Sequence, residues 1–103
     1  LDDIAGGDRD VVAGLLRDFI ESTGRDLAAV VAAHDGGSAD AVARDAHRIK
    51  GAARLVGAFA LGDAADALER QARLGEKPTK AAVEKLAAAF EALKAWAARD
   101  GST

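Results

Sequence analysis

The chain has 103 residues, enough for one domain, and three Phe and one Trp are its only aromatic residues. A core must therefore be built from Ala, Leu, Val and Ile, and an alanine-rich composition with a single proline favours helix. A net charge of −3 argues against a nucleic-acid-binding domain, the lack of cysteine excludes disulfides and thiolate metal sites, and no apolar run approaches a membrane span.

The first half of the chain predicts a short lead-in helix and then a long one. We expect the lead-in helix at Leu1–Ala5, followed by a turn at Gly6-Gly7-Asp8 whose aspartate caps the long helix. A stripe of residues spaced three or four apart then predicts a helix over residues 9–33. That stripe comprises Val12, Leu16, Phe19, Thr23, Leu27, Val30 and His34. Asp35-Gly36-Gly37 is a strong stop signal.

Three further helices follow the same pattern. Ser38 caps a helix expected over Ala39–Val56, which Gly57 ends. A third helix begins after Phe59 and stops at Gly75, and Pro78-Thr79 opens a fourth. Their apolar stripes are Val42, Ala46, Ile49, Ala53 and Val56; Leu61, Ala65, Leu68 and Ala72; and Val83, Leu86, Phe90, Leu93 and Ala97.

Short connections make consecutive helices antiparallel neighbours. The predicted fold is therefore all-α, an antiparallel up-down-up-down four-helix bundle with a short N-terminal lead-in helix. It forms a single domain over residues 1–103, and the polar tail Asp100–Thr103 is expected to fray.

His47 is the main candidate among the residues that the core pattern does not explain. On a helical wheel it lies well away from the buried stripe of the second helix, with Lys50 and Arg54 beside it and Gly51 one turn on. An exposed glycine inside a helix costs about 1 kcal/mol relative to alanine. Clearance is a physical reason for it, because a bare backbone step lets a second protein approach His47.

The cations of the second helix point to an anionic ligand. Arg44, Arg48, Lys50 and Arg54 together would attract a phosphoryl group or the acidic rim of a partner. A neutral imidazole has one nitrogen lone pair free to attack phosphorus, and a nearby ammonium can offset the charge of the transferring group.

A carboxylate on the third helix could hold the imidazole. A chain that folds back about Gly57–Ala58 brings residues 68–70 opposite His47. Glu69 could then accept a hydrogen bond from the other ring nitrogen, or it could simply pair with Arg73 four residues on.

Residues 46–58 read AHRIKGAARLVGA. This segment resembles the signature of histidine phosphotransfer (Hpt) domains: a His, Lys-Gly three and four residues on, and a Gly ten residues after the His. The resemblance implies a carrier that shuttles phosphoryl groups between aspartates of receiver domains, with His47 phosphorylated. It also implies that Lys50 offsets phosphoryl charge, that Gly51 gives access, and that Glu69 stands where the family often has Gln or Glu.

The resemblance extends to the setting of the domain. The chain is most similar to Hpt domains that end membrane-bound hybrid sensor kinases, which implies a cytoplasmic module, free or as a kinase tail. We expect a monomer that is not itself an enzyme, needs no cofactor or metal, binds receiver domains, and contacts neither nucleic acid nor membrane directly.

Two other functions stay open. A dimerising phosphoacceptor domain of a histidine kinase usually has a carboxylate directly after its His, whereas Arg48 follows here. A helical interaction module would carry His47 incidentally. Val11 and Leu15, which lie off the first stripe, pack either on the lead-in helix or in an apolar rim for a docking partner. His34 is expected to serve the end of its helix or the packing there.

Overall fold

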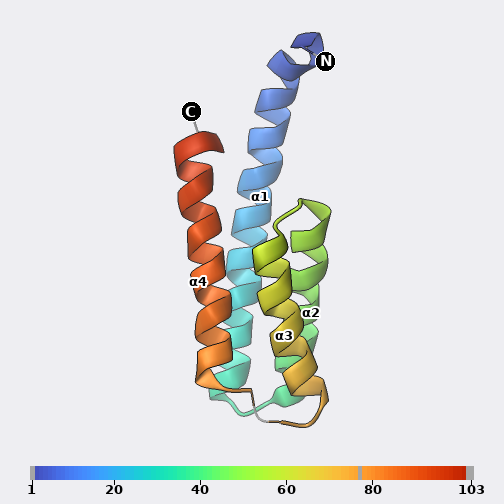
Figure 1. Ribbon diagram of the computed structural model, residues 1–103, viewed down its shortest axis with the longest axis vertical. Coiled ribbons are helices and arrows are strands. Elements are labelled where there is room, and N and C mark those ends of the chain that lie inside the picture. The colour runs from blue at the N-terminus through green and yellow to red at the C-terminus, as the bar shows by residue number, and fades with distance from the viewer. Residues whose placement is uncertain (1, 77, 102–103) are drawn as a thin grey trace.

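Four α-helices make up nearly all of the protein (Figure 1). The structure, a computed structural model, describes residues 2–76 and 78–101, and among them the side chains of residues 10–76 and 78–99. The helices are α1 (Asp2–Asp35), α2 (Ala39–Leu55), α3 (Phe59–Arg73) and α4 (Lys80–Trp96), and a π-helical turn, η1 (Ala97–Gly101), continues α4. No strand occurs in these ranges, which confirms the prediction of an all-α fold.

The helices lie along one another in an elongated bundle of 51 × 19 × 18 Å. In Figure 1 the chain runs down α1, up α2, down α3 and up α4, so that each helix is antiparallel to the one before it. Residues 36–38 and 56–58 make the first two connections, which are short enough to leave consecutive helices side by side. None of the described helices is both apolar and long enough to span a bilayer.

The start of α1 differs from the prediction. The helix is continuous from Asp2, so residues 6–8 form no turn and there is no separate lead-in helix among the described residues; Leu1 lies outside them. The physical reason is cooperativity: once a helix exists, each added residue gains a hydrogen bond, and a glycine weakens it by about 1 kcal/mol without ending it.

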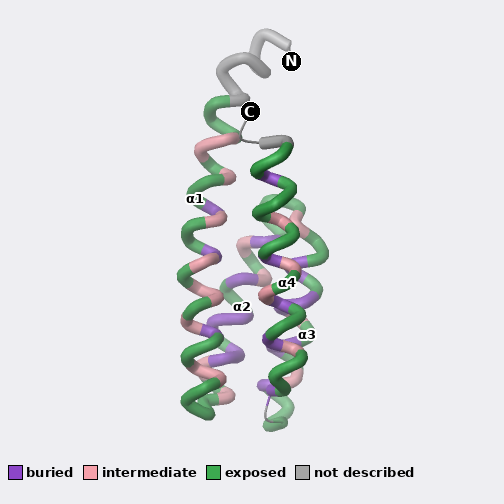
Figure 2. Tube along the Cα trace, turned by 90° about the vertical axis from the view of Figure 1, so that its left-hand side faces the viewer, coloured by how far each residue is buried: buried purple, intermediate pink, exposed green. Residues whose placement is uncertain are grey.

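The core lies in the part of the bundle where all four helices meet (Figure 2). The predicted stripes of α2, α3 and α4 supply it with Val42, Ala46, Ile49, Ala53, Leu61, Ala65, Leu68, Ala72, Val83, Leu86 and Phe90. Removing a large side chain of this kind from water contributes roughly 1.5–3 kcal/mol.

Two residues predicted in the core are exposed instead. Val12 is 58% exposed and Val56, the C-cap of α2, is 49% exposed. The ion pair between Arg48 and Asp26 marks the register of the antiparallel helices α1 and α2, and by that register Leu55, the last residue of α2, lies level with Phe19. Val12 therefore lies on the part of α1 that extends past the α2–α3 turn, where no residue from 10 to 18 is buried.

The α2–α3 turn fixes how the two helices that carry the polar residues face each other. Gly57 has a φ of +77°, which a residue with a side chain adopts only at a cost. The Ala58 amide donates to the Ala53 carbonyl at 2.8 Å and the Gly57 amide to the Arg54 carbonyl at 3.3 Å, the paired bonds of a Schellman motif. This closed helix end reverses the chain and starts α3 antiparallel to α2.

Candidate functional site

His47 lies in the middle of α2, on the side of the helix that faces away from the core. Ala46 and Ile49, one and two residues away in the chain, are fully buried, whereas the His47 side chain is 61% exposed. Because His47 lies outside the buried face of α2, the imidazole is fixed at its base by a helix and is open to solvent at its tip.

Glu69 holds one nitrogen of that ring. The α2–α3 turn brings Glu69 opposite His47, and a carboxylate oxygen, Oε2, accepts a hydrogen bond from His47 Nδ1 at 3.0 Å. A carboxylate only accepts, so Nδ1 carries the hydrogen and the lone pair of the neutral ring is on Nε2. Nε2 has no hydrogen-bond partner among the described residues, which leaves it available to react.

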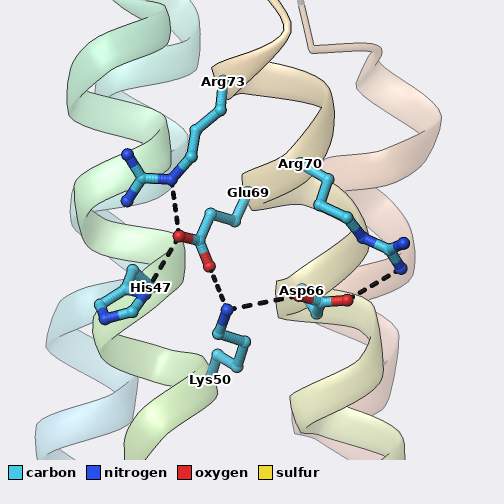
Figure 3. Close-up of polar contacts among 6 residues, drawn as sticks. All are labelled: His47, Lys50, Asp66, Glu69, Arg70 and Arg73. Carbon is cyan, nitrogen blue, oxygen red and sulfur yellow. Dashed lines mark hydrogen bonds and ion pairs between the residues drawn. The ribbon is translucent and has the colours of Figure 1, made fainter.

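Glu69 is the centre of a network that spans α2 and α3 (Figure 3). Its side chain is only 6% exposed; Lys50 Nζ lies 2.6 Å from Oε1, and Arg73 Nε donates to Oε2 at 2.7 Å. Lys50 Nζ also lies 3.3 Å from Asp66, and Arg70 pairs with Asp66 at 2.8 Å. The carboxylate that orients His47 is therefore itself held from two sides.

The charges of this network keep Glu69 ionised. Burial alone would raise the pKa of Glu69, but its bonds to Lys50 and Arg73, with the nearby His47, outweigh burial and lower the pKa from 4.5 to about 2. The bond to Glu69 in turn raises the pKa of Lys50, against a smaller effect of burial, with Asp66 adding to the rise. A fixed negative charge is thus present on the Nδ1 side of the imidazole across the neutral pH range.

Gly51 leaves the backbone bare one turn from His47. A Cβ built at Gly51 would meet no atom within 4 Å, and the residue is exposed. Packing inside the protein therefore does not require this glycine, which agrees with an open approach to the imidazole.

A family model described as Hpt domain matches residues 14–96, which is most of the chain. The chain belongs to the Hpt domain family. Hpt domains are phosphocarrier modules that act in histidine phosphotransfer within phosphorelays, interact with receiver domains and are not enzymes in the ordinary sense. No match is found among curated proteins or among solved structures.

The cations of this Hpt domain are arranged differently from the prediction. Lys50 was expected to lie beside His47 and offset phosphoryl charge; its side chain is 16% exposed and lies between α2 and α3, in contact with the carboxylates of Asp66 and Glu69. Arg44 contacts Asp45 at 3.4 Å, and Arg48 contacts Asp26. The predicted basic patch is therefore partly neutralised, because buried and half-buried carboxylates on α1, α2 and α3 attract the side chains towards the bundle.

Arg54, the remaining cation of that set, is exposed, and none of the described carboxylates forms an ion pair with it. Val11 and Leu15 are also exposed, at 58% and 61%. With no separate lead-in helix in the described part of α1, the structure shows no lead-in packing for these two residues.

Sequence reasoning found Glu69 but missed Asp66 and assigned Arg73 only an alternative role. Arg73 does pair with Glu69, and it does so together with His47 rather than in place of it. Asp66 could have been found by the reasoning that found Glu69. If Glu69 lies opposite His47 across an antiparallel pair, the residue three before Glu69 lies opposite the residue three after His47, which is Lys50.

His34 has the structural role that the sequence predicted. It lies in the last turn of α1 with its side chain 19% exposed, and its Nε2 lies 2.9 Å from the Pro78 carbonyl oxygen. Because a carbonyl only accepts, Nε2 carries the hydrogen and ties the end of α1 to the segment before α4.

Proposed function

We propose that this Hpt domain accepts a phosphoryl group on Nε2 of His47 from a receiver-domain aspartate and donates it onward to another. The observation that carries the proposal is the asymmetry of the imidazole: Nδ1 donates to an ionised carboxylate, and Nε2 is open to solvent. On a histidine without such a partner either ring nitrogen can carry the hydrogen, whereas the buried carboxylate of Glu69 leaves Nε2 of His47 as the nucleophile.

In the proposed step His47 is the nucleophile, Glu69 stabilises the charge that His47 gains, and the aspartyl phosphate of the receiver is the donor. The Nε2 lone pair attacks phosphorus, a P–N bond forms, and the acyl phosphate P–O bond breaks with the receiver carboxylate as leaving group. The hydrogen stays on Nδ1, so the ring becomes positively charged, and Glu69 at 3.0 Å stabilises that charge. Donation to the next receiver is the same step reversed.

The same proposal extends to the setting of the domain. We infer that the domain is a monomer in the cytoplasm and that a receiver domain docks across the exposed side of α2. Gly51 provides clearance, Arg44, Arg48 and Arg54 provide charge, and Val11 and Leu15 form an apolar rim towards the exposed end of α1. Charge of this kind affects mainly the rate of encounter and partner choice.

Incubation with phosphorylated receiver domains tests the function. We expect label to move from a receiver to the chain, to be lost in acid and to survive base, as a P–N bond does. His47→Gln should abolish labelling, and His34→Gln, the matched control, should retain it. Label that persists in His47→Gln would contradict the assignment, and receiver binding without labelling of the unaltered chain would favour a plain interaction module.

A further inference from the structure

An open hollow of about 550 Å³ lies beside His47 on the surface between α2 and α3. Its lining comprises Asp40, Ala43, Arg44, His47 and Arg73. The other α2 residues in this set all precede His47. Because helical side chains lean towards the N-terminus of their helix, the imidazole leans towards the hollow. Lys50 is not part of the lining.

The guanidinium of Arg73 is held next to the imidazole. Arg73 Nε donates to Glu69 Oε2, the oxygen that also accepts from His47 Nδ1, whereas Lys50 contacts the other oxygen (Figure 3). Arg73 is 57% exposed, and only one of the five N–H groups of its guanidinium is used in this bond. The rest are available to an anion in the hollow.

Arg44 supplies a second guanidinium from the other wall. Its side chain is 67% exposed, and its one contact in the described part of the chain is the 3.4 Å approach of Nε to Asp45. Planar guanidinium groups match the oxygens of a phosphoryl group in pairs of hydrogen bonds. Lys50, by contrast, is 16% exposed and already engaged with two carboxylates.

We propose that Arg73 and Arg44, rather than Lys50, bind the phosphoryl group carried by His47, and that Lys50 positions Glu69. The proposal rests on the proposed function of His47. Asp40 lines the same hollow and opposes the two arginines, so anion binding there is the balance of three charges.

Phosphoramidate, a small anionic donor, tests this site without a docking partner. The P–N bond of the donor breaks with ammonia as leaving group, and a P–N bond forms to His47 Nε2. Intact-mass measurement of the labelling rate should show a fall of about tenfold in Arg44→Gln/Arg73→Gln, because the variant loses two charge interactions and each contributes up to roughly fivefold. Arg73→Lys should recover part of the rate, and Asp40→Asn should increase it.

Arg17→Gln is the matched control, because it removes an exposed arginine from α1 that neither lines the hollow nor contacts Glu69. We expect its rate to stay within about twofold of the unaltered chain. The tenfold gap should shrink in 1 M salt, where the Debye length is about 3 Å. Circular dichroism checks folding, and the single variants Arg44→Gln and Arg73→Lys keep the test possible if the double variant unfolds.

Equal rates in the folded double variant and the unaltered chain would overturn the proposal. A loss of rate that salt does not change would also overturn it, since Arg73 would then only position Glu69. Failure of the proposed function is distinguishable from both outcomes. In that case His47 of the unaltered chain takes no label from phosphoramidate or from any receiver.

Discussion

The two histidines of this chain occupy regions that treat the same side chain in opposite ways. His34, at the end of α1, is 19% exposed and uses Nε2–H to hold the Pro78 carbonyl oxygen. His47, in the wall of α2, is 61% exposed and uses Nδ1–H to reach Glu69. The first region fixes the hydrogen on Nε2 and the second fixes it on Nδ1, so only His47 presents a free and exposed Nε2 lone pair. Reactivity here depends on the residue that holds the other nitrogen.

Glu69→Gln should have the largest effect on the difference between the two histidines. The amide cannot balance the charge that His47 gains, and a hydrogen bond to a charged group contributes about 1.5–3 kcal/mol, so phosphotransfer should slow by roughly 10- to 100-fold. Lys50 would lose a partner at 2.6 Å, and we expect the free energy of unfolding to fall by about 3 kcal/mol. Stopped-flow transfer and urea unfolding measure the two effects, and an unchanged transfer rate would exclude a role for Glu69.

Acid should remove the charge that distinguishes the His47 region. Because the pKa of Glu69 is lowered from 4.5 to about 2, its ionised form stabilises the fold fully above about pH 4.5, and this contribution is lost as pH falls through about 2. The corresponding loss of unfolding free energy is roughly 3 kcal/mol. Urea unfolding across this pH range should show this loss in the unaltered chain and not in Glu69→Gln. An equal loss of unfolding free energy in both proteins would contradict the assignment.

Sequence reasoning went furthest where one helix determines the outcome. The periodicity of α2 identified Ile49 as core and His47 as exposed, and both positions follow from helix geometry alone. Val12 has the same periodicity as the rest of its stripe, but whether it is buried depends on how far α2 extends along α1. Lys50 shows the same limit, because its direction depends on Asp66 and Glu69 on another helix.

His34→Gln tests the other histidine, whose role is structural. Loss of the 2.9 Å bond to the Pro78 carbonyl oxygen should lower the free energy of unfolding by about 1 kcal/mol and leave labelling of His47 unchanged. Thermal unfolding and the receiver assay measure the two readouts. A large loss of labelling in a folded variant would show that the two regions are coupled.

Gly51→Ala gives the smallest effect on stability and separates access from chemistry. A Cβ at Gly51 meets nothing within 4 Å, so alanine should stabilise α2 by up to about 1 kcal/mol. Transfer from a receiver should slow, whereas labelling by phosphoramidate should not change. Gly24→Ala is the control. A Cβ at Gly24 would lie 3.6 Å from Phe90 Cζ, away from the site, so this variant should gain stability without slowing transfer. Transfer as fast as in the unaltered chain would remove the clearance role of Gly51.

Determination of the phosphorylated nitrogen tests the central claim most directly. Correlated ³¹P and ¹⁵N NMR of the phosphorylated chain, with ¹⁵N in its imidazoles, shows which ring atom is bonded to phosphorus. We predict phosphorus on Nε2 of His47 with the hydrogen retained on Nδ1. Phosphorus on Nδ1 would contradict the account, because the atom that Glu69 holds would then be the one that reacts.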